Sequence, residues 1–185
     1  MIKDISLSSC ENSSFVKTKR MHYTQKGIKK AWDMVEVHDS VAVLVYHKDK
    51  NAFVLVKQFR PPVYLKNSDG FTYELCAGIV DKECSLEQIA KEEIDEECGF
   101  NVPLENIDKI TSFYTAVGFA GAHQTLYYCE VDDNMKEHEG GGIHVEDIEV
   151  VYLDIKEAQD FLFDETKAKT PGIMYAMMWW FKNKA

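Results

Sequence analysis

Apolar residues in the first third of the chain follow the patterns of β-strands. SVAVLVYH (40–47) and NAFVLVKQF (51–59) are rich in β-branched and aromatic residues, which is typical of buried strands. The polar link between them suits a hairpin turn. SFVKTKRMHYTQ (14–25) and KKAWDMVEV (29–37) are two further candidate strands, with Lys26-Gly27 as the turn that joins them. The sequence therefore predicts four strands before residue 60.

A helix follows a short strand in the middle of the chain. TYELCAG (72–78) has the composition of a strand that ends at a glycine, after a turn cluster at 67–70. From Ser85 the apolar residues recur at helical spacing, and Ser85 with Gln88 matches a capping box. Gly99 is where this helix should end. The apolar positions of the helix are Leu86, Ile89, Ala90 and Ile94.

The remaining elements complete an α+β pattern. Strands are predicted at 107–114, 123–131 and 147–153, and helices at 155–163 and 171–183. A polar, Gly-rich stretch at 132–146 is expected to be a mobile loop. Strands on both sides of one central helix, with more helix at the end, predict a mixed sheet sandwiched by helices.

Composition narrows the class of protein. The 185 residues are 45% hydrophobic, which suits one medium-sized domain with a packed core. A net charge of −10 argues against a nucleic-acid or anionic-membrane surface. Five cysteines without a CxxC pair indicate reduced, mostly buried thiols in a cytoplasmic protein, and no zinc site. We find no signal peptide, and the apolar run at 173–181 is too short to span a bilayer.

The stretch KEEIDEECG (91–99) places five carboxylates in six positions. On a helix, like charges four residues apart cost about 0.2–0.5 kcal/mol per pair. A solvated acidic face is the simplest interpretation. The alternative is that Glu93, Glu96 and Glu97 converge on a cation, because such an array of hard oxygen ligands suits magnesium or manganese.

The same residues resemble the signature of a known family. Gly78, Glu93, Glu96, Glu97 and Gly99 fall at the spacing of the Nudix box, the loop–helix motif of the Nudix hydrolases. The stretches HDSVAVLVY, VLVKQFRPPVY, YELCAGIVD and GGGIHVEDIEVV are similar to the UDP-sugar pyrophosphatase branch, which is close to the ADP-ribose pyrophosphatases. The resemblance covers about residues 23–181 and implies a Nudix fold with a metal-dependent hydrolase activity.

Two positions depart from the family pattern. Cys84 stands where the box has a glutamate, and Glu92 stands where it has a basic residue, usually arginine. Glu92 removes a charge that would help to orient the neighbouring glutamates. These departures support an alternative from another class, a catalytically weak Nudix-fold nucleotide-binding module.

The resemblance implies roles for individual residues. Glu93 and Glu97 match the principal metal ligands and catalytic glutamates, Glu96 a supporting ligand, and the Ala77 carbonyl a backbone ligand. The cofactor would be Mg²⁺, or Mn²⁺. A base for the attacking water would come from the late loop, where the candidates are Glu146, Glu139 and His144, in that order.

Substrate contacts and assembly are also implied by the resemblance. Arg60 matches an arginine that contacts the diphosphate, and Glu74 would touch the substrate or a metal-bound water. Gly118 lies in a turn that lines the sugar-phosphate side, and Trp32 would stack on a base. Residues 1–38 form an N-terminal β extension that would mediate a homodimer, and 39–185 form the hydrolase domain. The expected reaction converts UDP-glucose to UMP and glucose 1-phosphate. The alternative substrate is ADP-ribose, which gives AMP and ribose 5-phosphate.

Overall fold

A computed structural model describes residues 2–13, 16–143 and 146–184. The chain divides into two compact units. One contains the residues up to His38 together with 114–122, and the other contains 39–113 and the residues from His123 onward. The sequence predicts a boundary at residue 38, but it assigns 114–122 to the hydrolase domain.

A two-stranded antiparallel ribbon forms most of the first unit. Its strands are β1 (Lys17–Gln25) and β2 (Ile28–Glu36), joined by Lys26 and Gly27, which both have positive φ. The register places Met21 opposite Trp32. Within this unit, the Val35 N–H donates to the carbonyl oxygen of Phe119 at 2.8 Å, so the 114–122 segment extends the hydrogen bonding of the ribbon.

A seven-stranded mixed sheet is the centre of the fold. Its strands are β3 (Ser40–His47), β4 (Ala52–Phe59), β5 (Phe71–Glu74), β6 (Cys76–Ile79), β7 (Asp108–Thr115), β8 (Ala122–Val131) and β9 (Ile148–Asp154). The main order is β5-β4-β3-β8-β7, with β6 paired to β3 and β9 paired to β4. β3 and β8 run parallel, while β3 pairs antiparallel with β4 and β6.

The predicted strand at 72–78 is two strands in the structure. Glu74 pairs with Val56 on β4, whereas Ala77 pairs with Ala42 on β3. The chain changes partner at Leu75, because β3 and β4 pair directly only at residues 45–47 and 52–54 and leave their other halves open to new partners. This change of partner brings β6 into contact with the helix at Leu86–Cys98, which carries the acidic stretch of the sequence.

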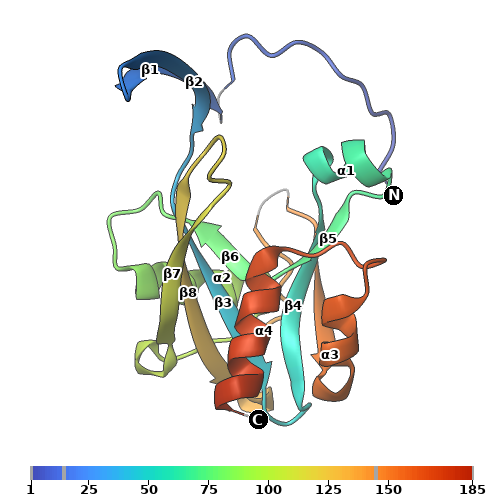
Figure 1. Ribbon diagram of the computed structural model, residues 1–185. Helices are drawn as coiled ribbons and strands as arrows, with labels where there is room; N and C mark the ends of the chain where they lie inside the picture. Colours follow the sequence, from blue (N-terminus) through green and yellow to red (C-terminus); the bar gives the residue numbers. More distant parts are fainter. Residues whose placement is uncertain (1, 14–15, 144–145, 185) are drawn as a thin grey trace. The chain divides into compact units, whose positions relative to one another are not determined.

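Helices cover both faces of the sheet, which confirms the predicted sandwich. α2 (Leu86–Cys98) packs on one face, and α3 (Ile155–Phe163) and α4 (Pro171–Asn183) pack on the other. In Figure 1, α4 lies in front of the sheet and α2 behind it. Alternate residues of β3 enter the two cores: Val41, Val43 and Val45 face α2, and Ala42 and Leu44 face the other helices.

One helix was not predicted. α1 (Pro61–Asn67) begins at the two prolines that end β4, and Ser68 closes it with φ +60°. Proline is favoured in the first turn of a helix because its missing N–H would be unpaired there. The prolines that stop the strand therefore also start a helix. Two short 3₁₀ helices, η1 (Leu104–Asn106) and η2 (Asp133–Met135), lie in connecting segments.

The predictions for the cysteines are confirmed for three of the five. Cys76, Cys98 and Cys129 are free and buried, and Cys10 and Cys84 are free and exposed. Among the described residues, no helix has both the length and the apolar character needed to cross a membrane.

Candidate active site

Helix α2 is fixed at both ends by the caps that the sequence predicts. The Ser85 hydroxyl accepts a hydrogen bond from the Gln88 N–H at 3.2 Å. At the other end, Gly99 has φ +74° and its N–H bonds the carbonyl oxygen of Asp95 at 2.8 Å. Ile89, Ala90 and Ile94 are buried against the sheet. The buried face fixes the rotation of α2 about its own axis, and this rotation points Glu93 and Glu97 toward β6.

Glu97 is held by the backbone of β6. Only 5% of the residue is exposed, and its Oε2 accepts a hydrogen bond from the Ala77 N–H at 2.9 Å. Burial raises the pKa of Glu97 to about 8; the Ala77 N–H opposes this shift, and the charges of Glu93 and Glu146 add to it. The carboxylate is therefore placed where its ionised form lacks the stabilisation of water.

Glu93 lies directly over Gly78. A Cβ at position 78 would collide with the Glu93 carboxylate, so any other residue here would displace that side chain. Burial raises the pKa of Glu93 to about 7, and the charges of Glu96 and Glu146 add to the shift. The half-buried Glu96 thus belongs to the same group of carboxylates.

This group fits a divalent cation. It offers only oxygen donors, as magnesium and manganese prefer. The buried Glu97 and the half-buried Glu93 repel each other when both are ionised. A cation between them would favour the ionised forms and remove the repulsion. The residues that could hold it are Glu93, Glu97 and Glu96, all from one helix.

A second group of possible metal ligands lies at the hairpin between β3 and β4. One ligand atom each of His47, Asp49 and Asp133 lie within 4.8 Å of one another. Lys50 Nζ is 3.2 Å from the Asp133 carboxylate, so this group already contains a cation. Among the described residues this is the group whose three ligand atoms lie so close together, whereas those of Glu93, Glu96 and Glu97 do not.

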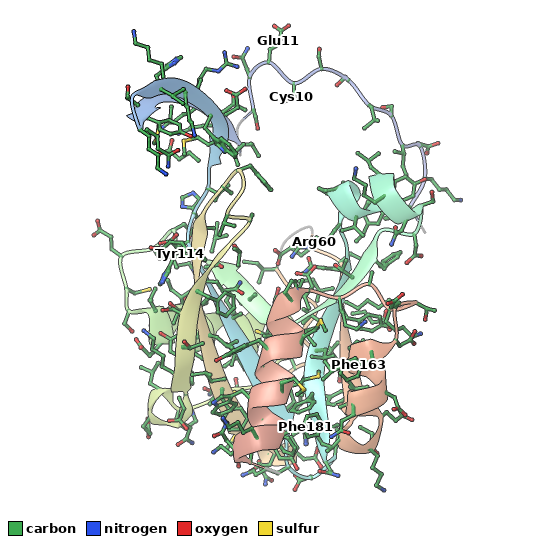
Figure 2. The ribbon with its side chains drawn as sticks, in the orientation of Figure 1. Cys10, Glu11, Arg60, Tyr114, Phe163 and Phe181 are labelled. Atoms are coloured by element: carbon green, nitrogen blue, oxygen red, sulfur yellow. The ribbon has the colours of Figure 1, made fainter. Side chains whose placement is uncertain are left out.

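Arg60 and Glu74 form a two-bonded ion pair. Arg60 lies at the junction of β4 and α1, and Figure 2 labels it there. Its Nε and Nη2 donate to the two oxygens of Glu74 at 2.7 and 2.8 Å. The hydrogen bonds to Glu74 raise the pKa of Arg60, and the charges of Glu97 and Glu146 raise it further. Arg60 is therefore a positive charge that interacts electrostatically with Glu97 and Glu146, and its direct partner is Glu74.

The Gly-rich loop is bonded to the end of α2. The N–H groups of Gly141 and Gly142 donate to the carbonyl oxygens of Glu97 and Glu96, at 2.9 and 3.0 Å. Unpaired carbonyls at the end of a helix need such donors. The sequence predicts a mobile loop here, and the described part of it has these fixed backbone bonds.

The three candidate bases have different surroundings. The exposed Glu146 accepts a hydrogen bond from the Ile143 N–H at 2.9 Å, and its charge raises the pKa of both Glu93 and Glu97. Glu139 is also exposed, and its charge contributes to the raised pKa of Tyr152, after burial. His144 lies outside the described residues. Of the two described candidates, Glu146 is the one whose charge acts on both Glu93 and Glu97.

The two departures from the box have distinct structural consequences. Glu92 accepts hydrogen bonds from Lys82 Nζ at 2.7 Å and from Gln88 Nε2 at 3.1 Å. Lys82 lies in the loop before α2, and its charge lowers the pKa of Glu93 against the raising effects there. A positive charge thus stands beside the glutamates although position 92 is acidic. Cys84 is exposed.

Trp32 and Gly118 lie together in the first unit. The Trp32 indole N–H donates to the carbonyl oxygen of Gly118 at 2.8 Å, and 53% of Trp32 is exposed. Trp32 is therefore not a core residue, which would have been the common environment of a strand tryptophan.

The sequence analysis did not single out Thr72, whose hydroxyl donates a hydrogen bond to Glu74 Oε1 at 2.5 Å, or Lys82, the partner of Glu92. Thr72 precedes Glu74 by two positions, so a strand places both on one face; that spacing is a signal that could have been used. Lys82 gave no such signal, because its partner is ten residues away across a loop.

Comparison with known proteins finds a matching domain, and relatives that match nearly the whole chain. Residues 36–172 match the NUDIX domain. The chain is 35% identical to the uridine diphosphate glucose pyrophosphatase NUDT14 of Bos taurus, over 97% of this chain and 94% of that protein. The Mus musculus NUDT14 is 34% identical over 98% and 95% of the two chains. A GDP-mannose pyrophosphatase of Cronobacter sakazakii is 35% identical over 85% and 82%. The resemblance inferred from residues 78–100 is confirmed, and the chain belongs to the Nudix family.

Proposed function

We propose that this protein is a metal-dependent pyrophosphatase that hydrolyses the diphosphate of a nucleotide sugar, with UDP-glucose as the leading substrate. The observation that carries the proposal is the group of buried and half-buried glutamates on α2, with the charge of Arg60 acting on Glu97, inside a chain whose residues 36–172 match the NUDIX domain. Two relatives that match nearly the whole chain are named UDP-glucose pyrophosphatases, which supports this choice of substrate.

The residues divide the task by charge. Glu93, Glu97 and Glu96 would hold Mg²⁺, with the Ala77 carbonyl as a further oxygen donor. When bound, Mg²⁺ neutralises diphosphate charge and lowers the pKa of water. Arg60 would bind the diphosphate oxygens, for which guanidinium is well suited.

Glu146 is our choice for the base. It would accept the proton of the water that attacks one phosphorus, while the bond from that phosphorus to the bridging oxygen breaks. The products are UMP and glucose 1-phosphate. The support for this role is the effect of its charge on both glutamates.

GDP-mannose is the second candidate substrate, since a protein named for that activity is 35% identical to this chain. ADP-ribose would use the same carboxylates and arginine and change only the base and the sugar. A comparison of the three substrates therefore tests recognition of the base and the sugar, because the hydrolysis of the diphosphate is the same in all three.

A coupled phosphate assay tests the proposal. We expect magnesium-dependent turnover of UDP-glucose, abolished by EDTA, with GDP-mannose and ADP-ribose slower. A preference for either of those two would keep the mechanism and change the substrate. Lack of turnover on all three with magnesium or manganese would contradict the proposal and favour a nucleotide-binding module.

We further propose that the protein is a cytoplasmic homodimer whose ribbon lies in the interface. Met21 and Trp32, an opposed pair on the ribbon, are 51% and 53% exposed, and an isolated two-stranded ribbon is marginally stable. Free, buried thiols are typical of a reducing compartment. Light scattering should give twice the mass of one chain for the wild type and a lower mass for Met21→Glu. A monomeric wild type would contradict the dimer.

Trp32 would stack on the substrate base, with the Gly118 carbonyl fixing its indole ring. Trp32→Ala should then raise the KM for UDP-glucose, whereas Trp32→Phe should retain part of the affinity. An unchanged KM in both variants would exclude the stacking role.

A further inference from the structure

The Arg60–Glu74 ion pair has a third member on β5. Thr72, on β5, donates a hydrogen bond from its hydroxyl to Oε1 of Glu74 at 2.5 Å. Thr72 is 6% exposed and Glu74 9%, so this bond is made away from water. Hydrogen bonds to a buried charged group are among the stronger ones in proteins.

Glu74 is the acceptor in every hydrogen bond that joins these three side chains. Oε1 of Glu74 accepts from both Thr72 and Arg60 Nε, and Oε2 accepts from Arg60 Nη2. Both carboxylate oxygens are therefore engaged, and the carboxylate plane is set by donors on two sides. A carboxylate held in this way orients a guanidinium plane, because the two-bonded pair requires the planes to match.

The backbone around Arg60 is fixed as well. Its N–H donates to the Gly70 carbonyl at 2.8 Å, and its carbonyl accepts from Val63 and Tyr64 in the first turn of α1. A guanidinium carries five N–H groups, and two of them bond Glu74, which leaves three for a ligand. The Arg60 side chain is 47% exposed, so these free donors are accessible to a ligand.

We propose that Thr72 is a positioning residue for substrate binding: its hydroxyl holds Glu74, and Glu74 in turn orients the free N–H groups of Arg60 toward the diphosphate. This inference rests on the proposed function for the identity of the ligand. It also changes the expected role of Glu74, from a substrate contact to the support of Arg60.

Two substitutions at one position separate the hydroxyl from the shape of the side chain. Thr72→Val removes the hydroxyl and keeps the volume, and Thr72→Ser keeps the hydroxyl. We expect Thr72→Val to raise the KM for UDP-glucose at least about fivefold with little change in kcat, and Thr72→Ser to stay within about twofold of wild type. A loss of orientation affects ground-state binding first, which is why the KM should respond.

A control variant and a binding measurement make the test independent of turnover. Thr111→Val makes the same change on β7, at the opposite end of the sheet order from β5, and should leave the KM unchanged. Calorimetry with UDP and magnesium measures diphosphate affinity without hydrolysis. The Kd should rise in Thr72→Val by about the same factor as the KM.

The outcomes distinguish the two proposals. Wild-type protein that binds UDP but hydrolyses no nucleotide sugar would refute the proposed function, and the Kd values would still decide the role of Thr72. An equal Kd for wild type and Thr72→Val would overturn the inference, as would equal defects in the Val and Ser variants. A parallel loss in Thr111→Val would overturn it too, because the effect would then come from stability. Thermal unfolding of each variant verifies that the fold is intact.

Discussion

Single residues on α2 determine whether the site can bind a cation. Glu97 combines burial, a hydrogen bond from β6 and a pKa of about 8. Glu93 has a pKa of about 7 for similar reasons. In the metal-free protein, burial disfavours the ionised form of both side chains, and this is the form that binds a metal.

We expect Glu97→Gln to reduce hydrolysis at least about 100-fold, because it removes a negative oxygen donor while keeping the hydrogen bond from Ala77. The folded protein should be retained, since the neutral amide is less costly to bury than a carboxylate. Turnover and circular dichroism measured together test this. Activity near that of wild type would show that Glu97 is not a metal ligand.

The Lys82–Glu92 ion pair leads to a second prediction about single residues. Restoring the family's arginine with Glu92→Arg would place a cation against Lys82, so this substitution should lower activity instead of raising it. The double variant Lys82→Glu/Glu92→Arg reverses the pair and should recover at least the lost stability. Because both side chains are substantially exposed, the coupling free energy should be about 0.2–1 kcal/mol. Zero coupling in a double-mutant cycle would show that the pair is incidental.

At the scale of elements, the end of α2 and the Gly-rich loop form one structure. The carbonyl of Gly99 accepts from the N–H groups of Glu137 and His138, at 2.9 and 3.4 Å. His138 Nε2 is also 3.0 Å from the Asp95 carboxylate. The loop that carries Glu146 is therefore anchored to the helix that carries the other glutamates.

This anchoring predicts a large effect of Gly99→Ala. The new Cβ would collide with the backbone carbonyl of His138, at a position with φ +74°. We expect a loss of more than about 1 kcal/mol in the free energy of unfolding, together with lower activity. Gly141→Ala is the control, because φ is also positive there but the nearest contact would be an ordinary 3.5 Å. Equal effects of the two substitutions would mean that the collision does not matter.

At the scale of the whole molecule, Glu93 and Glu97 link the stability of the protein to pH and to metal binding. The pKa values of Glu93 and Glu97 in the folded protein lie above the ordinary value of 4.5. Between the two values the folded state binds more protons than the unfolded state, so the contribution of these groups to the free energy of unfolding falls as the pH rises.

In EDTA, the melting temperature of the wild type should therefore fall as the pH rises from about 5 to about 8. The melting temperature of Glu97→Gln should fall less over the same range. Magnesium should raise the melting temperature of the wild type more at the higher pH, where the cation meets ionised carboxylates. Scanning calorimetry at several pH values measures both effects. The same pH dependence in wild type and variant would contradict the assignment of the shift to Glu97.

Local patterns in the sequence determined most of the elements, including the helix that carries the candidate metal ligands. The period of the apolar residues and the caps at Ser85 and Gly99 predicted α2, and the spacing of its glutamates predicted the group of carboxylates, because these features depend only on neighbours along one helix. Pairings between distant segments were decided by the tertiary structure. The change of strand partner at Leu75, the Arg60–Glu74 ion pair and the Lys82–Glu92 pair all depend on where separate strands and loops meet, and no local period records that.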